Sequence, residues 1–214
     1  VGVLRHQGDA VAEVDACKTN GVVLAVGHEH RFKPVTMDVL RMARSGELGT
    51  IGSVIAELTA TTGFHRTAGS WRTRPEEEPA GAMASIGIHL VDAMIWMLGR
   101  VRDVHCIAGH RGGPHGNDTT SLLLRFESGA TGHAYCSVVV ARNFRFAAYG
   151  TRGFAEVLTP GMDTFRFIPA TAGRASHLAP LPAAEVIETP GFQSVAETLA
   201  QFARCARERQ PFPV

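Results

Sequence analysis

Three polar side chains recur within an otherwise apolar stretch, and their spacing is the strongest chemical signal in the chain. The stretch reads G-A-M-A-S-I-G-I-H-L-V-D over residues 81–92. On a helix, positions three or four apart share a face, which would bring Ser85, His89 and Asp92 together. Because polar groups are costly to bury unpaired and an imidazole exchanges protons near neutral pH, the stretch is the leading candidate for acid–base chemistry. Asp92 is expected to brace His89, and a core histidine without chemistry is the competing interpretation.

A second group of polar residues, H-E-H-R, occupies positions 28–31 directly after the apolar run at 22–27. The run predicts a buried strand, and ligand crevices of open α/β sheets lie at the carboxyl ends of strands. His28 and His30 flank Glu29, a spacing that can bind a metal when a third ligand converges. Spacing identifies no third ligand, so we predict a polar loop at the mouth of a strand and no metal site.

The remaining sequence must supply the elements that position these groups. Residues 10–20 predict a helix with Asp9 as N-cap and a stop at Asn20-Gly21. A helix from Pro34, a strand over 51–62, a loop over 63–80 and a helix over 83–98 follow. The loop holds Trp71-Arg72, either a lid element or a surface anchor, and an acidic run at 76–78 expected on the solvated surface.

Beyond residue 99 the pattern changes to period two with β-branched residues. It predicts strands over 101–108, 119–126, 130–140, 144–150 and 154–158, short strand or coil pieces over 159–190, and a closing helix over 192–209. The order indicates a mixed α/β (α+β) fold: an α/β remnant, a helix–strand–helix link, a run of antiparallel strands and a final helix.

Composition excludes several classes of function. The 214 residues carry a net charge of +1 and are 45% hydrophobic, so neither nucleic acid nor an anionic membrane is an expected partner. The apolar runs are too short to span a membrane, and no signal peptide pattern is present. The four cysteines contain no C-x-x-C pair, which favours reduced thiols in a cytoplasmic protein. The start at Val1 indicates a piece of something longer.

Five stretches, in order along the chain, resemble the Gfo/Idh/MocA family of glucose–fructose oxidoreductase and inositol dehydrogenase relatives. They are G-V-V-L-A-V-G-H-E-H-R-F-K-P at 21–34, Trp71-Arg72, residues 81–92, N-D-T-T-S-L-L-L-R-F-E-S-G-A-T-G at 117–132, and F-A-A-Y-G-T-R-G-F-A-E-V at 146–157. The resemblance covers nearly the whole chain and marks it as the family's C-terminal portion. It implies a Rossmann remnant at 1–31 and, at 32–214, a substrate-binding and oligomerisation domain with a large, mostly antiparallel open sheet flanked by helices.

The resemblance also implies an activity and a set of site residues. The activity is NAD(P)-dependent hydride transfer to or from a hydroxyl carbon of a sugar, a polyol or a related small cyclic substrate. His89 matches the family's catalytic histidine and is the expected acid–base group. Ser85 stands where a catalytic aspartate is usual and is expected to act beside His89 by holding a substrate hydroxyl. The implied substrate contacts are His30, Trp71 and Arg72. His28 and Arg31 fall where the cofactor would lie, and a homo-oligomer is expected through the open face of the sheet.

The chain departs from the family's pattern in two places. The glycine-rich dinucleotide fingerprint is absent, and no Glu-Lys-Pro motif precedes residue 22. NAD or NADP is therefore expected in the intact protein, and this chain alone is expected to be inactive. The alternative is a non-catalytic sugar-binding or oligomerisation module that lacks the cofactor-binding half.

Overall fold

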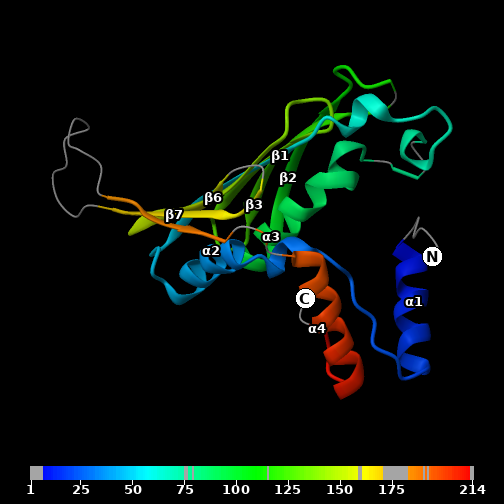
Figure 1. The fold of residues 1–214 in the computed structure, drawn as a ribbon, viewed down its shortest axis with the longest axis horizontal. Helices are drawn as coiled ribbons and strands as arrows, with labels where there is room; N and C mark the ends of the chain where they lie inside the picture. Colours follow the sequence, from blue (N-terminus) through cyan, green and yellow to red (C-terminus); the bar gives the residue numbers. More distant parts are fainter. Residues whose placement is uncertain are drawn as a thin grey trace.

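An eight-stranded sheet dominates the computed structural model (Figure 1), which describes residues 7–74, 77–78, 80–114, 116–158, 161–170, 183–189, 191 and 193–212. The strands are β1 (Ile51–Thr59), β2 (Val101–Gly109), β3 (Thr119–Phe126), β4 (Thr131–Ser137), β5 (Asn143–Gly150), β6 (Gly153–Leu158), β7 (Thr164–Pro169) and β8 (Glu185–Glu188). The helices are α1 (Gln7–Thr19), α2 (Pro34–Ser45), α3 (Ile88–Leu98) and α4 (Ser194–Glu208).

The strand order is β2-β3-β4-β1-β5-β6-β7-β8, and neighbouring strands are antiparallel except for the parallel pair β1 and β4. Most consecutive strands pair as antiparallel neighbours. Strand β1 is separated from the later strands in sequence by α3, and it lies in the middle of the sheet between β4 and β5. A parallel pair such as β1 and β4 needs a long connection of this kind. The mostly antiparallel open sheet flanked by helices is thereby confirmed.

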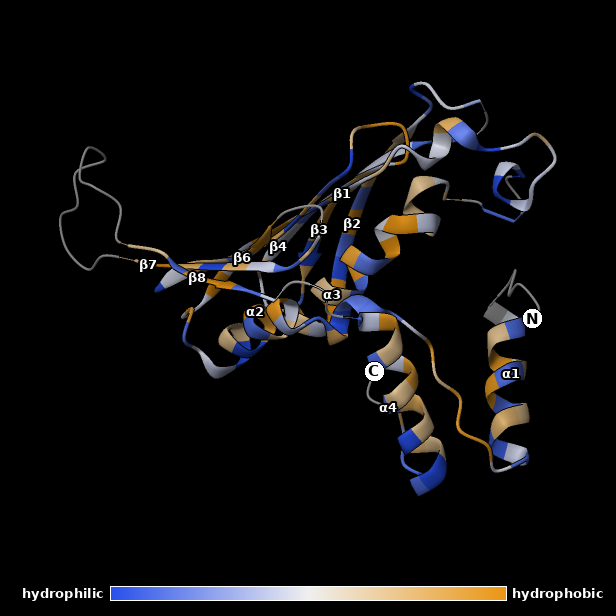
Figure 2. Ribbon diagram, viewed as in Figure 1, coloured by the Kyte–Doolittle hydropathy of each residue, from blue (hydrophilic) through white to orange (hydrophobic). Residues whose placement is uncertain are grey.

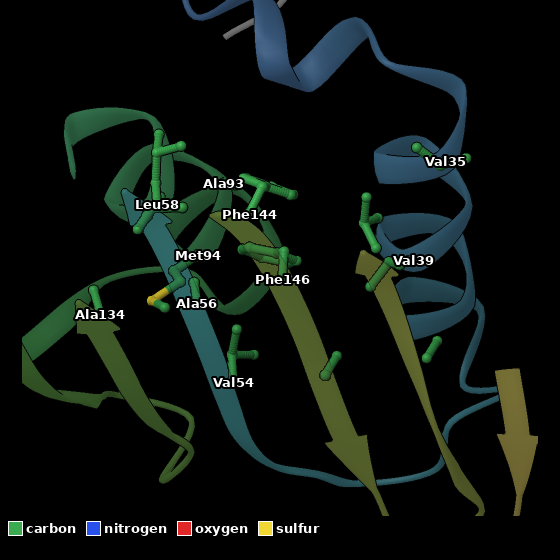
Figure 3. Close-up of a cluster of buried hydrophobic side chains, with 14 of the residues drawn as sticks. Val35, Val39, Val54, Ala56, Leu58, Ala93, Met94, Ala134, Phe144 and Phe146 are labelled. Carbon is green, nitrogen blue, oxygen red and sulfur yellow. The ribbon is translucent and has the colours of Figure 1, made fainter. Parts of the chain in front are cut away.

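Helices α2 and α3 cover one face of the sheet and enclose the main core. Val35 and Val39 on α2 and Met94 on α3 are completely buried against Val54 and Phe146 of the sheet (Figure 3). Burying one such side chain stabilises the fold by about 1.5–3 kcal/mol. This packing anchors α3, the helix that carries His89 and Asp92, so the candidate acid–base residues sit on a rigid element.

The segment before α2 departs from the prediction. Helix α1 is confirmed and ends at Thr19, and Gly21 follows in a left-handed conformation, φ 61°. The described part of the helix already begins at Gln7, so Asp9 lies within its first turn rather than at the N-cap. The strand predicted over 22–27 is wrong: these residues run as an extended segment beside the body of the fold (Figures 1 and 2), with Val22 57% and Val26 62% exposed. A buried parallel strand needs hydrogen-bonded neighbours, and no described strand pairs with this one.

The other elements lie close to their predicted places. The predicted strands over 51–62 and 130–140 end earlier, at Thr59 and Ser137, while the range 159–190 contributes β7 and β8. Within that range, residues 159–160, 171–182 and 190 lie outside the described residues. Across the described part of the chain, the helices are all too short or too polar to cross a bilayer.

Candidate functional site

Three histidine rings meet where the turn after residue 27 contacts α3. The turn is a short 3-10 helix, Glu29–Phe32. His28 Nδ1 lies 3.4 Å from His89 Nδ1, although 61 positions separate the two residues in sequence. The rings of His30 and His89 stack with centroids 4.3 Å apart. The structure thus brings together three of the residues singled out in the sequence.

Glu29 adds a carboxylate to these rings. Its Oε1 lies 3.6 Å from His30 Nε2, and its Oε2 lies 3.7 Å from His89 Nδ1. The four residues His28, Glu29, His30 and His89 are referred to below as the histidine cluster. Sequence spacing marked Glu29 only as the residue between two histidines, because its approach to His89 depends on how the turn docks on α3.

Burial favours the neutral imidazole at two members of the histidine cluster, His28 and His30. His30 is only 7% exposed, and its burial, together with His89, Lys33 and His28 nearby, lowers its pKa to about 3. Burial also lowers the pKa of His28, against the opposing influence of Asp92. A neutral imidazole keeps one nitrogen lone pair free to accept a proton or a ligand. At neutral pH, His30 therefore presents an uncharged ring with a free nitrogen lone pair.

The turn is held to α3 by an ion pair beside the cluster. The guanidinium of Arg31 donates two hydrogen bonds to the carboxylate of Asp92, with Nε 2.6 Å from Oδ2, and both side chains are largely buried. Asp92 thus binds Arg31, which corrects the interpretation that it braces His89. Paired charges of this bidentate kind fix geometry, so the pair positions His28 and His30 against the helix. Arg31, predicted to contact the cofactor, has its guanidinium engaged by Asp92.

Ser85 belongs to a second group of polar residues. It lies in a π-helical turn, Met83–Gly87, that leads directly into α3. Arg66 Nη2 donates to Ser85 Oγ at 3.0 Å, and Arg66 Nη1 donates to Glu78 Oε2 at 2.6 Å. We refer to Arg66, Glu78 and Ser85 as the arginine cluster. Ser85 also donates to the carbonyl of Gly81 at 3.2 Å, so its hydroxyl is engaged by this cluster.

The charges of the arginine cluster are buried. The side chains of Arg66 and Glu78 are 6% and 3% exposed. The expectation that the acidic run over 76–78 is solvated is therefore wrong for Glu78 and for Glu77, whose side chain is 8% exposed, while Glu76 lies outside the described residues. Three adjacent glutamates are typical of a solvated surface. The burial of Glu78 could not be predicted without knowing that the loop brings Arg66 back against it.

A polar hollow of about 490 Å³ lies beside the arginine cluster. Its wall is formed by Thr62, His65, Arg66, Thr67, Ser70, Arg72, Ser85 and Ile86. The Arg72 guanidinium lies 4.0 Å from the centre of the Trp71 ring, which is 43% exposed, and the Arg72 carbonyl accepts a hydrogen bond from Arg66. The predicted substrate residues therefore divide: Trp71 and Arg72 lie at the arginine cluster, and His30 lies in the histidine cluster.

The π-helical turn that leads into α3 is preceded by a glycine whose conformation and close packing matter. Gly81 has φ 53°, and a Cβ there would come within 1.9 Å of the Asn117 carbonyl oxygen. That backbone position is in turn held by Asp118, whose carboxylate accepts hydrogen bonds from the amides of residues 111–113. Burial opposes the charge of Asp118, but the amides of Gly113, Gly112 and Arg111 outweigh it and lower its pKa to about 2. The loop before β3 thus fixes where the π-helical turn begins.

Solved structures share this architecture. Levoglucosan dehydrogenase in complex with NADH and levoglucosan superposes with a TM-score of 0.81 at 17% identity, over 97% of this chain and 63% of that one. An aldose-aldose oxidoreductase from Caulobacter crescentus gives 0.78 at 21% identity, over 97% of this chain and 60% of that one. An oxidoreductase domain protein from Kribbella flavida gives 0.75 at 18% identity, over 94% and 60%. At these identities the likeness shows a common fold, and this chain spans less than two thirds of each protein.

The family is shown by the sequence of the sheet and its helices. Residues 36–156, more than half of the chain, match the GFO/IDH/MocA C-terminal domain. The match runs from α2 through β6 and includes α3 with His89. The chain therefore belongs to the Gfo/Idh/MocA family, of which it carries the C-terminal domain.

Proposed function

We propose that this chain forms the substrate-binding and acid–base part of an NAD(P)-dependent oxidoreductase. The substrate would be a sugar, a polyol or a related small cyclic compound. The observation that carries the proposal is the convergence of two further imidazoles and a carboxylate on His89 of α3, the helix whose preceding π-helical turn borders the polar hollow. Its support includes the family match and the sugar-related names of the structural neighbours.

In this proposal His89 transfers the proton of the reacting hydroxyl. Oxidising a hydroxyl carbon to a carbonyl removes a hydride from carbon and a proton from oxygen, and a positioned base is needed for the proton. His89 Nδ1 faces His28 and Glu29, which assigns the proton transfer to Nε2. Glu29 would stabilise the imidazolium that results, and so supply the carboxylate that Ser85 does not.

The polar hollow suits the rest of such a substrate. Four residues along a helix advance about 6 Å, so the Ser85 end of the hollow lies roughly one helical turn from His89. Hydroxyl and guanidinium groups from Thr62, Ser70 and Arg72 line it, and these groups can bond several sugar hydroxyls at once. Trp71 would offer an apolar ring face beside them.

The described residues do not by themselves fit a dinucleotide. A pyrophosphate is usually held at the N-terminus of a helix that follows a glycine-rich turn between paired parallel strands. Residues 7–28 provide one helix and one unpaired extended segment. This chain is therefore assigned the proton transfer and the substrate binding alone. In the intact protein, NAD or NADP would accept or donate the hydride.

The lack of fit between the described residues and a dinucleotide favours a second candidate, a sugar-binding or oligomerisation module without catalysis. An assembly would use the face of the sheet opposite α2 and α3, where Ile107 and Leu123 are 63% and 47% exposed. Light scattering of the purified chain should then give a dimer or larger species, and a monomer would count against assembly through this face.

The test of the enzyme proposal uses the product of the natural gene, with whatever sequence precedes Val1. Sugars and polyols are screened with NAD⁺ and NADP⁺, and reduced nicotinamide is followed by absorbance. We expect turnover with at least one compound, and loss of that turnover in His89→Asn with nucleotide binding retained. Retained turnover would exclude His89 as the base. Binding of a sugar with no nucleotide binding at all would favour the module.

A further inference from the structure

The histidine cluster has the composition and spacing of a metal site, which goes beyond the proposed function. One ligand atom each from Glu29, His30 and His89 lies within 4.8 Å of the others. His28 Nδ1 lies 3.4 Å from His89 Nδ1 but outside this group of three. The third ligand that a His-x-His pair requires, and that spacing in the sequence did not reveal, is therefore His89 on α3.

The separations within the cluster fit a shared ion better than direct hydrogen bonds. Hydrogen bonds from nitrogen to oxygen are about 2.7–3.2 Å long, whereas Glu29 lies 3.6 Å from His30 and 3.7 Å from His89. Ligands about 2.0–2.2 Å from a tetrahedral zinc ion are roughly 3.3–3.5 Å from one another. The two separations from Glu29 lie within a few tenths of an ångström of these values.

The surroundings supply the support that a metal site needs. His30 is buried against Phe144, whose ring centroid is 5.8 Å away. The buried Arg31–Asp92 pair holds the turn that bears His28, Glu29 and His30 against the helix that bears His89. Ligands held in place by neighbouring packing and hydrogen bonds bind metals more tightly than mobile ones.

The geometry points to a binding site for one divalent transition-metal ion, of the zinc class, formed by Glu29, His30 and His89. Imidazole and carboxylate together suit Zn²⁺, Co²⁺ or Ni²⁺ rather than Mg²⁺ or Ca²⁺, which prefer oxygen ligands alone. An ion bound here would join residues 28–30 to α3 and occupy the Nδ1 atom of His89.

The test is a titration of the metal-free 214-residue chain with Zn²⁺ by calorimetry and with Co²⁺ by visible absorption. We expect one ion per chain and a tetrahedral cobalt spectrum. No thiolate charge-transfer band is expected, since the group that would hold the ion contains no cysteine. His89→Ala and Glu29→Gln should each weaken binding by more than the roughly 10–100-fold that loss of an outer-shell partner costs. His133→Ala, an exposed histidine on β4, is the matched control and should bind as the parent does.

Three results would overturn the inference: no saturable binding, unchanged affinity in both His89→Ala and Glu29→Gln, or a thiolate band in the cobalt spectrum. Circular dichroism of each variant shows that it is folded, and Glu29→Gln, which keeps the side chain's size, decides the case if His89→Ala is not. Because the readout is metal binding, the outcome is independent of whether the intact protein oxidises a sugar.

Discussion

The histidine cluster and the arginine cluster lie one helical turn apart, yet their polar groups are used in opposite ways. In the arginine cluster, Arg66 reaches Glu78 at 2.6 Å and Ser85 at 3.0 Å, and its charges are almost fully buried. In the histidine cluster, the polar atoms stay 3.4–3.7 Å apart. The polar groups of the arginine cluster already bind one another, whereas those of the histidine cluster are far enough apart to bind a ligand.

Two residues that the sequence spacing predicted on one helix face belong to different clusters in the structure. Ser85 and His89 are four positions apart, but the π-helical turn and its partners assign Ser85 to Arg66 and leave His89 to the turn at 28–30. π-Helical turns inside helices are frequent at functional sites. We infer that Ser85 positions Arg66 at the wall of the polar hollow, while His89 carries the chemistry.

Breaking the arginine cluster should have the largest effect on stability. Glu78→Gln leaves the Arg66 charge buried without its partner, and loss of one member of a buried ion pair costs about 3–5 kcal/mol. Urea unfolding measures the change in the free energy of unfolding. The control is Glu127→Gln, whose partner Arg100 is 87% exposed, and for which about 0–1 kcal/mol is expected. Equal effects of the two substitutions would show that burial does not distinguish these ion pairs.

Acid should destabilise the histidine cluster through His30. Its pKa is about 3 in the folded protein, against 6.5 for an unperturbed histidine, so the unfolded chain binds a proton that the folded chain does not. The free energy of unfolding keeps the full contribution of neutral His30 well above pH 6.5, and it falls as the pH drops from there toward 3. At about 1.4 kcal/mol per pH unit, the loss would be about 2 kcal/mol by pH 5. Unfolding experiments at pH 7 and pH 5 measure it.

The matched variant for this pH dependence is His30→Phe, which keeps an aromatic ring beside Phe144 but has no group to titrate. Its stability should change less between pH 7 and pH 5 than that of the parent. An identical loss in both proteins would place the pH dependence elsewhere, with His28, whose pKa burial also lowers, as the next group to replace.

The smallest effect is expected at Ser85. Ser85→Ala removes one hydrogen bond from Arg66, worth about 0.5–1.5 kcal/mol, and should leave the ring resonances of His89 in place by NMR. Glu29→Gln should move those resonances, because its carboxylate lies 3.7 Å from His89 Nδ1. The reverse pattern would mean that Ser85, and not Glu29, governs the environment of His89.

The helices and the sheet could be predicted because their patterns are local. The alternating residues 119–126 became β3 with the same bounds, and Pro34 began α2 as expected. The apolar run at 22–27 has the composition of a buried strand but is not one, since pairing partners are not encoded in the run itself. A local pattern therefore predicts an element only when the chain also provides its neighbours.

The candidate site could be predicted in its residues but not in its contacts. His28, His30 and His89 stood out by type and spacing, yet the approach of Glu29 to His89 spans 60 positions and depends on the docking of a turn on α3. Arg66 and Glu78 gave no signal, because a loop arginine and an acidic run resemble solvated surface until they are seen paired.

The division of roles between the two clusters can be tested by comparing kcat of His89→Asn with that of Ser85→Ala in the product of the natural gene. Loss of a positioned general base lowers turnover by about 10²–10⁴-fold. We predict a loss of this size for His89→Asn and a far smaller one for Ser85→Ala. A larger loss for Ser85→Ala than for His89→Asn would contradict this division, because the chemistry would then belong to the arginine cluster.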